Sequence, residues 1–444
     1  MATSDTPLTV FAHINGGWAP CGQLRLTERD NTPVASDFAY GLNYLKRPDA
    51  VEVDPVSLSI ANRSQVSGQR LRPVNNLELF GGIRDAAPDA WGRRVIEAKL
   101  KVPANTLPES QYLLHAGSER VGALDIRRSL QDSPAPGRTD WHSLQHLMEA
   151  AERIEAGLPV PAHLDTIFLA GTSLGGARPK ASVRDDDGVL WLAKFSSAQD
   201  RVDVPAIESA SLQLARVASL TVPDVRTTWV GDRRVMLIKR FDRIWHPCTS
   251  VMSPHSSAET PASTEHRLPF NSGLTLLGCD ESESRTKGYG DLADAIRRHV
   301  HTDCVRDNNA ELFKRMVFNI LVSNDDDHLR NHGFLWDPTF KGWCLSPLYD
   351  VMPRASLASE RFLHLSIGPQ GRLATLDNAL AAGARFSLPE REALQAIDQV
   401  WRVVRQWRMY FDEFGVQEQD MERIAPAFRH IDDISSTELR RKLP

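Results

Sequence analysis

Three consecutive carboxylates, Asp325, Asp326 and Asp327, follow an apolar stretch that ends near Val322. Like charges this close together raise one another's proton affinity, so the run is costly unless metal ions or basic groups neutralise it. An acidic turn solvated at a helix end is the ordinary explanation, and this stretch alone favours it. The chemical alternative is a site in which a carboxylate and a metal ion act together.

The spacing of the carboxylates relative to Asn331 distinguishes them. Protein kinases place a catalytic Asp five positions before an Asn; the Asp orients the attacking hydroxyl and the Asn holds magnesium. Asp326 and Asn331 have this spacing, whereas Asp325 lies six positions and Asp327 four positions before the same Asn. The spacing selects Asp326 as candidate base, although such an Asp-to-Asn pair is frequent by chance.

A second acidic motif is LSPLYDVMP, residues 345–353. In it, Asp350 follows an apolar segment and lies nineteen residues beyond Asn331. Phosphoryl transfer requires a metal ion that bridges the terminal phosphates, and kinases hold it with the Asn and a downstream Asp of a DFG motif. The sequence here is YDV rather than DFG. Asp350 is therefore a candidate magnesium ligand, without the activation-loop behaviour of standard kinases.

Lys194 lies inside the apolar run VLWLAKF. A buried ammonium without a partner is expensive, so an anion is expected beside it. Glu208, in the helical segment that follows, is the natural candidate, as in the lysine and helix glutamate pair of kinases. The alternative is a strand lysine that extends its ammonium into water.

The segment GTSLGGARPK, residues 171–180, combines three glycines, two hydroxyls and two cations. Small residues let backbone amides approach phosphates. The segment matches neither the P-loop pattern nor the kinase G-x-G-x-x-G spacing. It predicts a phosphate loop of another type, although a serine among glycines is more often only a turn residue.

Five motifs in this order resemble the HipA family. They are GTSLGGARPK (171–180), IKRFDR (238–243), LPFNSGLTLLG (268–278), NDDDHLRNHGF (324–334) and SPLYDVMP (346–353). AAPDAWGRR (86–94) and GSERVGAL (117–124) also resemble the N-terminal domain of that family, so the similarity covers nearly the whole chain.

The resemblance implies a role for each matching residue. It makes Asp326 the catalytic base, Asn331 and Asp350 the magnesium ligands, Lys194 the lysine that pairs with phosphates, and His328 a contact near those phosphates. Ser173, Gly175, Gly176 and Lys180 match the phosphate loop, and Ser173 matches the serine that the family autophosphorylates, with Thr172 a weaker candidate.

The motif IKRFDR implies contacts with the nucleoside. Lys239 and Phe241 fall where the backbone of the family's hinge meets adenine, and Asp242 falls where a carboxylate can reach the ribose. The alternative for Asp242 is a cap or an ion pair with Arg240 or Arg243.

HipA proteins are kinases that use ATP and Mg²⁺ to phosphorylate a serine of an aminoacyl-tRNA synthetase, best known for glutamyl-tRNA synthetase, which arrests growth. They pair with HipB, a helix-turn-helix antitoxin that binds operator DNA. The resemblance implies the same cofactors and partners here. The residues after Ser173 and the polar insertion at 246–267 depart from the pattern of the family.

The bulk composition is that of an ordinary globular protein, with 41% hydrophobic and 25% charged residues. A formal charge of −5 disfavours direct binding to DNA, so contact with an operator is expected mainly through the antitoxin. Five scattered cysteines indicate neither a zinc site nor a disulfide framework. No leader or membrane segment is evident, and we expect a cytoplasmic protein.

These patterns predict an α+β protein, with a small α/β N-terminal domain, a two-lobed protein-kinase-like core and a mainly helical C-terminal lobe. The expected segments are residues 1–130 for the N-terminal domain, 131–160 for a connection and helix, 161–245 for the nucleotide lobe, 246–267 for a mobile polar loop, and 268–444 for the helical lobe. The alternatives are a small-molecule kinase of the aminoglycoside or choline type, and a catalytically weak corepressor scaffold for an antitoxin.

Overall fold

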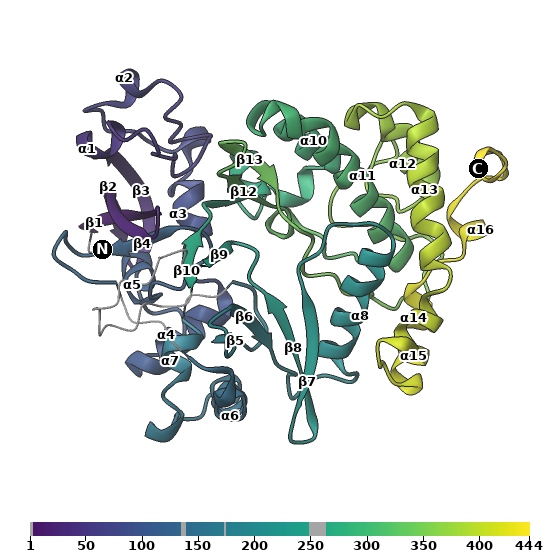
Figure 1. Ribbon diagram of the computed structural model, residues 1–444, viewed down its shortest axis with the longest axis horizontal. Helices are drawn as coiled ribbons and strands as arrows, with labels where there is room; N and C mark the ends of the chain where they lie inside the picture. Colours follow the sequence, from purple (N-terminus) through teal and green to yellow (C-terminus); the bar gives the residue numbers. More distant parts are fainter. Residues whose placement is uncertain (1–2, 135–138, 173–174, 248–262) are drawn as a thin grey trace, which may run out of the picture. The chain divides into compact units, whose positions relative to one another are not determined.

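The computed structural model describes residues 3–134, 139–172, 175–247 and 263–444. The chain divides into two compact units, shown together in Figure 1. Unit 1 comprises Met1–Trp191 and Arg240–Phe270, and unit 2 comprises Leu192–Lys239 and Asn271–Pro444.

An antiparallel sheet of order β3-β2-β1-β4 forms the first core of unit 1. Its strands are β1 (Thr3–Ile14), β2 (Gly17–Arg29), β3 (Thr32–Tyr40) and β4 (Leu124–Arg127). Asn15 and Gly16, which join β1 to β2, both have positive φ, as a two-residue hairpin turn that matches the strand twist requires. Alternating apolar residues such as Leu24, Leu26 and Phe38 face the core because successive strand side chains point to opposite faces.

Unit 1 also contains helices. They are α1 (Leu42–Leu45), α2 (Arg63–Val66), α3 (Gly81–Asp85), α4 (Ala90–Leu100), α5 (Glu109–His115), α6 (Leu144–Glu155) and α7 (Ile167–Ala170). The side chain of Asp89 caps α4 by accepting from the amide of Ala90. The helix expected within residues 131–160 is present as α6.

Three more strands of unit 1 are β5 (Lys180–Arg184), β9 (Arg243–Pro247) and β10 (Ser263–Arg267), and the chain passes into unit 2 within β6 (Leu190–Lys194). β9 and β10 pair antiparallel, with Pro247 opposite Ser263. The expected polar loop at 246–267 is therefore strand at both of its ends, because those backbones bond to each other. Residues 248–262 lie outside the described part of the chain.

Unit 2 begins with the predicted strand–helix–strand order. β6 is followed by α8 (Val204–Val217), β7 (Val225–Val230) and β8 (Arg233–Lys239), and β7 and β8 form an antiparallel hairpin. Asp203 caps α8 by accepting from the amide of Ala206, and Pro205 lies in its first turn, where the missing N–H costs nothing.

The remainder of unit 2 is mainly helical. Its helices are α9 (Gly273–Leu276), α10 (Tyr289–His299), α11 (Val305–Val322), α12 (Leu376–Ala382), α13 (Glu390–Val404), α14 (Trp407–Glu413), α15 (Glu418–Ile424), α16 (Ile431–Ile434) and α17 (Thr437–Lys442). α11 packs against α10, α12 and α13 (Figure 1) and is the central helix of this lobe. The half of α11 from Leu312 to Val322 is buried on nearly every side, together with the polar Arg315 and Asn319, as expected of a helix in the middle of a lobe.

A short sheet of order β11-β12-β13 completes unit 2. Its strands are β11 (Phe270–Ser272), β12 (Gly333–Asp337) and β13 (Gly342–Leu345). The mixture of a sheet-rich N-terminal part and a helical C-terminal part is the one that the sequence predicts. The expected segment boundaries remain a prediction, since the compact units group the chain differently. No helix in the described ranges combines the length and the apolar character needed to cross a membrane.

Candidate active site

The loop after α11 separates the three consecutive carboxylates. Ser323 ends the helix in the left-handed conformation, with φ of 52°, and the amide of Asn324 bonds back to the carbonyl of Asn319 at 3.0 Å. The chain then turns so that the side chain of Asp326 is 56% exposed, while that of Asp327 is only 1% exposed. The two neighbouring carboxylates therefore have different environments.

Asn331 is tied to Asp326 through the backbone. Its Nδ2 donates to the carbonyl of Asp326 at 3.2 Å, and the amide of His328 donates to the same carbonyl at 2.8 Å. Asn331 is 5% exposed and ends a 3-10 turn, Leu329–Asn331. This bond fixes the orientation of the Asn331 side chain, whose amide oxygen is the atom that a metal ion would require.

The segment around Asp350 lies against this loop. The hydroxyl of Tyr349 donates to the carbonyl of Arg330 at 2.7 Å, and the amide of Met352 donates to Oδ1 of Asn324 at 3.4 Å. Asp350 itself has a φ of 59°, a left-handed conformation that costs free energy in a residue other than glycine. These bonds fix where the Asp350 carboxylate is presented.

Lys194 of β6 is the cation at the centre of the cluster. Its Nζ lies 2.9 Å from Oδ1 of Asp350 and also bonds to Oε1 of Glu208, which α8 presents. Burial alone would lower the pKa of Lys194, but the charges of Asp350 and Glu208 outweigh it and raise the pKa above its usual value. The expected contact of Lys194 with Glu208 is present. Since Lys194 is only 9% exposed, it does not extend into water.

Arg354 is a residue of this region that the sequence patterns did not single out. Its Nη2 lies 2.8 Å from Oδ2 of Asp326, and its Nε lies 3.2 Å from Oδ1 of Asp325. Its amide bonds to the carbonyl of Ser323 at 3.2 Å. Arg354 thus supplies the basic group that a run of carboxylates requires, and no spacing rule in the sequence points to it.

His328 lies in the same loop, where it precedes the 3-10 turn. Its ring centroid is 5.9 Å from that of His364, nearly perpendicular to it, and Nε2 of His364 lies 2.9 Å from Oγ of Ser284. Burial first, and then the charge of His328, lower the pKa of His364. The two histidine rings are therefore in contact next to Asp326, to whose carbonyl the amide of His328 donates. A phosphate contact by His328 stays a prediction.

Magnesium would have to be bound jointly with phosphates. Carboxylate and amide oxygens are the hard donors that Mg²⁺ prefers, and it is usually held by one or two protein groups together with substrate phosphates and water. Asn331 and Asp350 supply such a set. Within the described ranges, no group of three or more His, Cys, Asp or Glu side chains is arranged to hold a metal by itself. The residues therefore fit a nucleotide-bound ion and not a closed protein cage.

The predicted phosphate loop belongs to unit 1. Nζ of Lys180 donates to the carbonyl of Gly175 at 2.6 Å, and the amide of Gly176, with φ of 77°, donates to Oδ2 of Asp89 at 3.0 Å. Thr172 is buried, and its hydroxyl donates to the carbonyl of Ala116 at 3.1 Å. Ser173 lies outside the described residues. Asp89, which also caps α4, anchors this loop, a role that the sequence did not suggest.

The motif IKRFDR places Asp242 between two buried arginines. Asp242 is 2% exposed, and its two oxygens accept from Arg240 at 2.7 Å, from Arg243 at 2.8 Å and from the amide of Gly122 at 2.7 Å. Burial would raise the pKa of Asp242, but the charges of both arginines lower it well below its usual range. The ion pair that the sequence left open is therefore present, and a contact of Asp242 with a ribose stays a prediction.

The two other residues that this motif assigns to the nucleotide, Lys239 and Phe241, have different surroundings. Lys239, the last residue of β8, bonds through its amide to the carbonyl of Asp224 at 2.8 Å, and its Nζ lies 3.8 Å from Oδ2 of the same residue. Phe241 is half-buried in unit 1. Contacts of their backbones with adenine remain a prediction.

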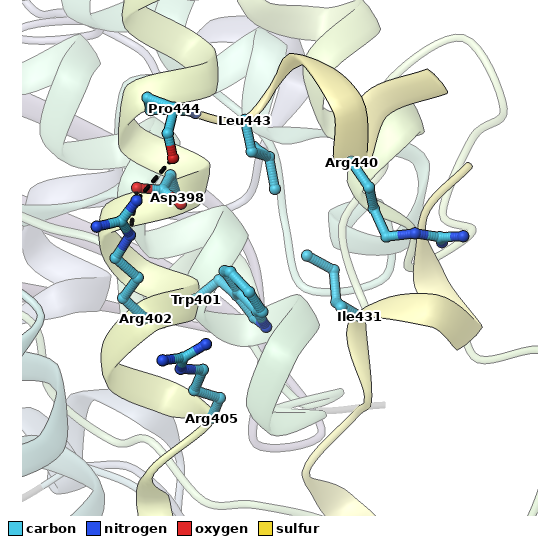
Figure 2. A pocket seen from close by; sticks show the side chains of 8 residues that line it. All are labelled: Asp398, Trp401, Arg402, Arg405, Ile431, Arg440, Leu443 and Pro444. Carbon is cyan, nitrogen blue, oxygen red and sulfur yellow. Dashed lines mark hydrogen bonds and ion pairs between the residues drawn. The ribbon is translucent and has the colours of Figure 1, made fainter. Parts of the chain in front are cut away.

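A cavity of about 400 Å³ lies in the helical lobe (Figure 2). It is lined by Asp398, Trp401, Arg402, Arg405, Ile431, Arg440, Leu443 and Pro444. Figure 2 shows Asp398, Trp401 and Arg402 of α13 on one side, with Pro444 next to Asp398 and Arg402, and it shows Ile431 of α16 and Arg440 of α17 on the other side. None of the predicted site residues lines this cavity.

Comparison with known proteins places the chain in a family. Residues 172–407, more than half of the chain, match the family model described as the HipA-like C-terminal domain. The chain belongs to the HipA family. Two proteins of Sinorhizobium fredii (strain NBRC 101917 / NGR234) are relatives of this HipA-family chain. The one named "Putative kinase Y4mE" is 25% identical over 81% of this chain and 84% of its own. The one named "Putative kinase Y4dM" is 24% identical over 71% of each.

A solved structure shares the fold of this HipA-family protein over nearly its whole length. It is the Shewanella oneidensis MR-1 toxin–antitoxin complex of HipA, HipB and operator DNA, with a TM-score of 0.62 and 14% identity. The match covers 97% of this chain and 96% of that one. The predicted fold class, an α/β N-terminal domain followed by a kinase-like core, is therefore confirmed.

We expect Lys194→Met to lower the free energy of unfolding by about 3–5 kcal/mol, because it removes the cation beside the buried Glu208. The double variant Lys194→Met with Glu208→Leu should recover most of that loss, since an apolar pair of similar volume avoids the charge burial. Urea denaturation of the three proteins measures both values. Equal losses in the single and double variants would contradict a buried pair.

We expect Asp242→Asn to lower the free energy of unfolding by about 3–5 kcal/mol, since it removes the charge that pairs with the buried Arg240 and Arg243. Of the two arginines, Arg243 keeps a second carboxylate, that of Glu265, at 3.4 Å. The control, Asp186→Asn, changes a carboxylate that is 68% exposed and should cost about 1 kcal/mol or less. Urea denaturation checks both variants. Normal stability of Asp242→Asn, together with weaker ATP binding, would instead support the ribose contact.

Proposed function

We propose that this HipA-family protein is an ATP- and Mg²⁺-dependent serine/threonine protein kinase that acts as the toxin of a toxin–antitoxin pair. The observation that carries the proposal is the contact of Lys194 with both Glu208 and Asp350. It joins the strand lysine and helix glutamate of a kinase to the predicted magnesium ligand. The names of the two Sinorhizobium fredii relatives agree with phosphoryl transfer.

The arrangement suits a reaction that needs positioning and charge neutralisation more than covalent chemistry. Mg²⁺, when bound, would neutralise the charge of the terminal phosphates of ATP. Asp350 is 52% exposed and keeps its position through Lys194, so its carboxylate can hold the ion together with the amide oxygen of Asn331. Lys194, fully charged at neutral pH, would balance the negative charge of the phosphates.

Asp326 would orient the attacking hydroxyl. Arg354 contacts its Oδ2, which leaves Oδ1 to accept the hydroxyl proton. In the transfer, a bond forms between the hydroxyl oxygen and the γ-phosphorus, the bond from that phosphorus to the bridging oxygen breaks, and ADP leaves.

The substrate and the partners follow from the family. We propose an aminoacyl-tRNA synthetase as substrate, glutamyl-tRNA synthetase first, with growth arrest or persistence as the result. The Shewanella oneidensis structure, which contains HipA, HipB and operator DNA, supports a HipB-like antitoxin as partner. With a formal charge of −5, this chain would contact DNA mainly through the antitoxin. We further propose a cytoplasmic location and autophosphorylation of Ser173.

We expect Asp326→Asn to lower phosphoryl transfer about 10²–10⁴-fold, because the variant keeps the shape of the side chain and loses the base. The matched control is Asp325→Asn, which removes the same charge from the adjacent, half-exposed residue and should cost less than about tenfold. The assay incubates each protein with labelled ATP, Mg²⁺ and purified synthetases, and mass spectrometry then locates phosphate on Ser173 and on the substrate.

The same assay can contradict the proposal. Transfer that is equal in Asp326→Asn and wild type would remove Asp326 from the mechanism. If the wild-type protein labels neither a synthetase nor itself, and the Ser173→Ala variant labels no synthetase either, the protein is not a protein kinase. Labelling of aminoglycosides or choline in place of protein would assign the site to a small-molecule kinase.

A further inference from the structure

We propose that Asp327 is the positioning residue of the loop 323–332. A buried hydrogen-bond network with Tyr289, Asn319 and His332 holds Asp327 and thereby fixes the backbone of the adjacent Asp326. The inference rests on the proposed function, because it concerns the same site. The sequence could only rank Asp327 as the carboxylate with the wrong spacing. The geometry gives it a separate task.

One oxygen of Asp327 receives three hydrogen bonds. The hydroxyl of Tyr289 donates to Oδ2 at 2.5 Å, Nδ2 of Asn319 donates to it at 2.8 Å, and Nε2 of His332 lies 3.0 Å from it. These donors come from three places in the chain: α10, α11 and the residue that precedes β12. Asp327 therefore joins both ends of the loop to the helical lobe.

The network is fully enclosed. Tyr289, Asn319 and His332 are each 0% exposed, and Asp327 is 1% exposed. Burial would raise the pKa of Asp327, but the charge of His332 and the bonds from His332 and Tyr289 lower it below its usual value. A buried carboxylate with this many donors resists displacement, because each lost bond would leave a polar group without a partner in the interior.

The same network reaches the second half of the site. Oδ1 of Asn319 accepts from Nδ2 of Asn324 at 3.1 Å, and Oδ1 of Asn324 accepts from the amide of Met352 at 3.4 Å. Met352 lies two residues beyond Asp350. Hydrogen bonds through Asn319 and Asn324 thus connect Asp327 with the segment that carries Asp350, the candidate magnesium ligand.

The close packing of the loop explains why a small shift would matter. A Cβ on Gly273 would meet the carbonyl of Leu329 at 2.8 Å, and the amide of Gly273 donates to the carbonyl of His332 at 2.7 Å. The loop is therefore in close contact with α9 at Leu329 and His332, and it is bonded to α10 and α11 through Asp327. Since Asp326 precedes Asp327 and is half-exposed, its orientation depends on the bonds of Asp327.

The test compares Asp327→Asn and Tyr289→Phe with a matched control, Asp398→Asn. Asp398 is also a buried carboxylate of unit 2, 6% exposed and paired with Arg402 at 2.7 Å, but it lies on α13. Each full-length variant is measured for kcat, for KM for ATP, and for hydrogen exchange of the peptide that covers residues 324–332. The exchange readout does not depend on activity.

For Asp327→Asn we expect a kcat lower by about 10²-fold with KM for ATP changed less than about threefold, because the reacting groups are misplaced while the nucleotide contacts remain. Exchange in residues 324–332 should quicken at least about tenfold while the α13 peptide keeps its protection. Tyr289→Phe, which retains the ring and two of the three donors, should lie between this variant and wild type. Asp398→Asn should keep the wild-type kcat and the wild-type loop exchange.

Two results would overturn the inference. The first is wild-type kcat and loop exchange in both Asp327→Asn and Tyr289→Phe. The second is faster exchange in the α13 peptide as much as in the loop, which would show a general stabilising role. If wild-type protein transfers no phosphate at all, the proposed function fails, whereas the exchange comparison still decides whether Asp327 holds the loop.

Discussion

The burial of one ammonium group, that of Lys194, is the constraint on which the candidate site depends. A buried cation costs free energy unless anions lie beside it, so β6 can carry this lysine only where α8 and the segment after β13 bring carboxylates to it. Glu208 and Asp350 meet that requirement. The same contact that makes the strand tolerable therefore holds a half-exposed carboxylate in a fixed place.

A second constraint acts within the loop after α11. Adjacent carboxylates repel each other, and the chain relieves this by giving each a different environment. Asp327 is buried and accepts three hydrogen bonds at Oδ2, while Asp326 is half-exposed beside Arg354. The charge run that looked like an ordinary solvated turn is thus divided into an anchored residue and a presented one. This division supports the assignment of Asp326 from its spacing to Asn331.

The sequence predicted the features that depend on local pattern or on short spacing. The helix within residues 131–160 and the helical C-terminal lobe were expected from the sequence, and the partner of Lys194 follows from the cost of burying a charge. Features that depend on distant contacts could not be predicted. Asp242 accepts a bond from the amide of Gly122, 120 residues away, and Arg354 meets Asp326 across 28 residues. No periodicity or motif indicates such pairs, because tertiary packing alone brings them together.

The most direct test of the central claim is a crystal structure of the protein with ATP analogue and Mn²⁺, in which anomalous scattering locates the metal independently of the protein density. The account predicts a metal bound to phosphate oxygens, to the amide oxygen of Asn331 and to the carboxylate of Asp350, with Asp326 facing the γ-phosphate. A metal–nucleotide complex that contacts neither Asn331 nor Asp350 would contradict it.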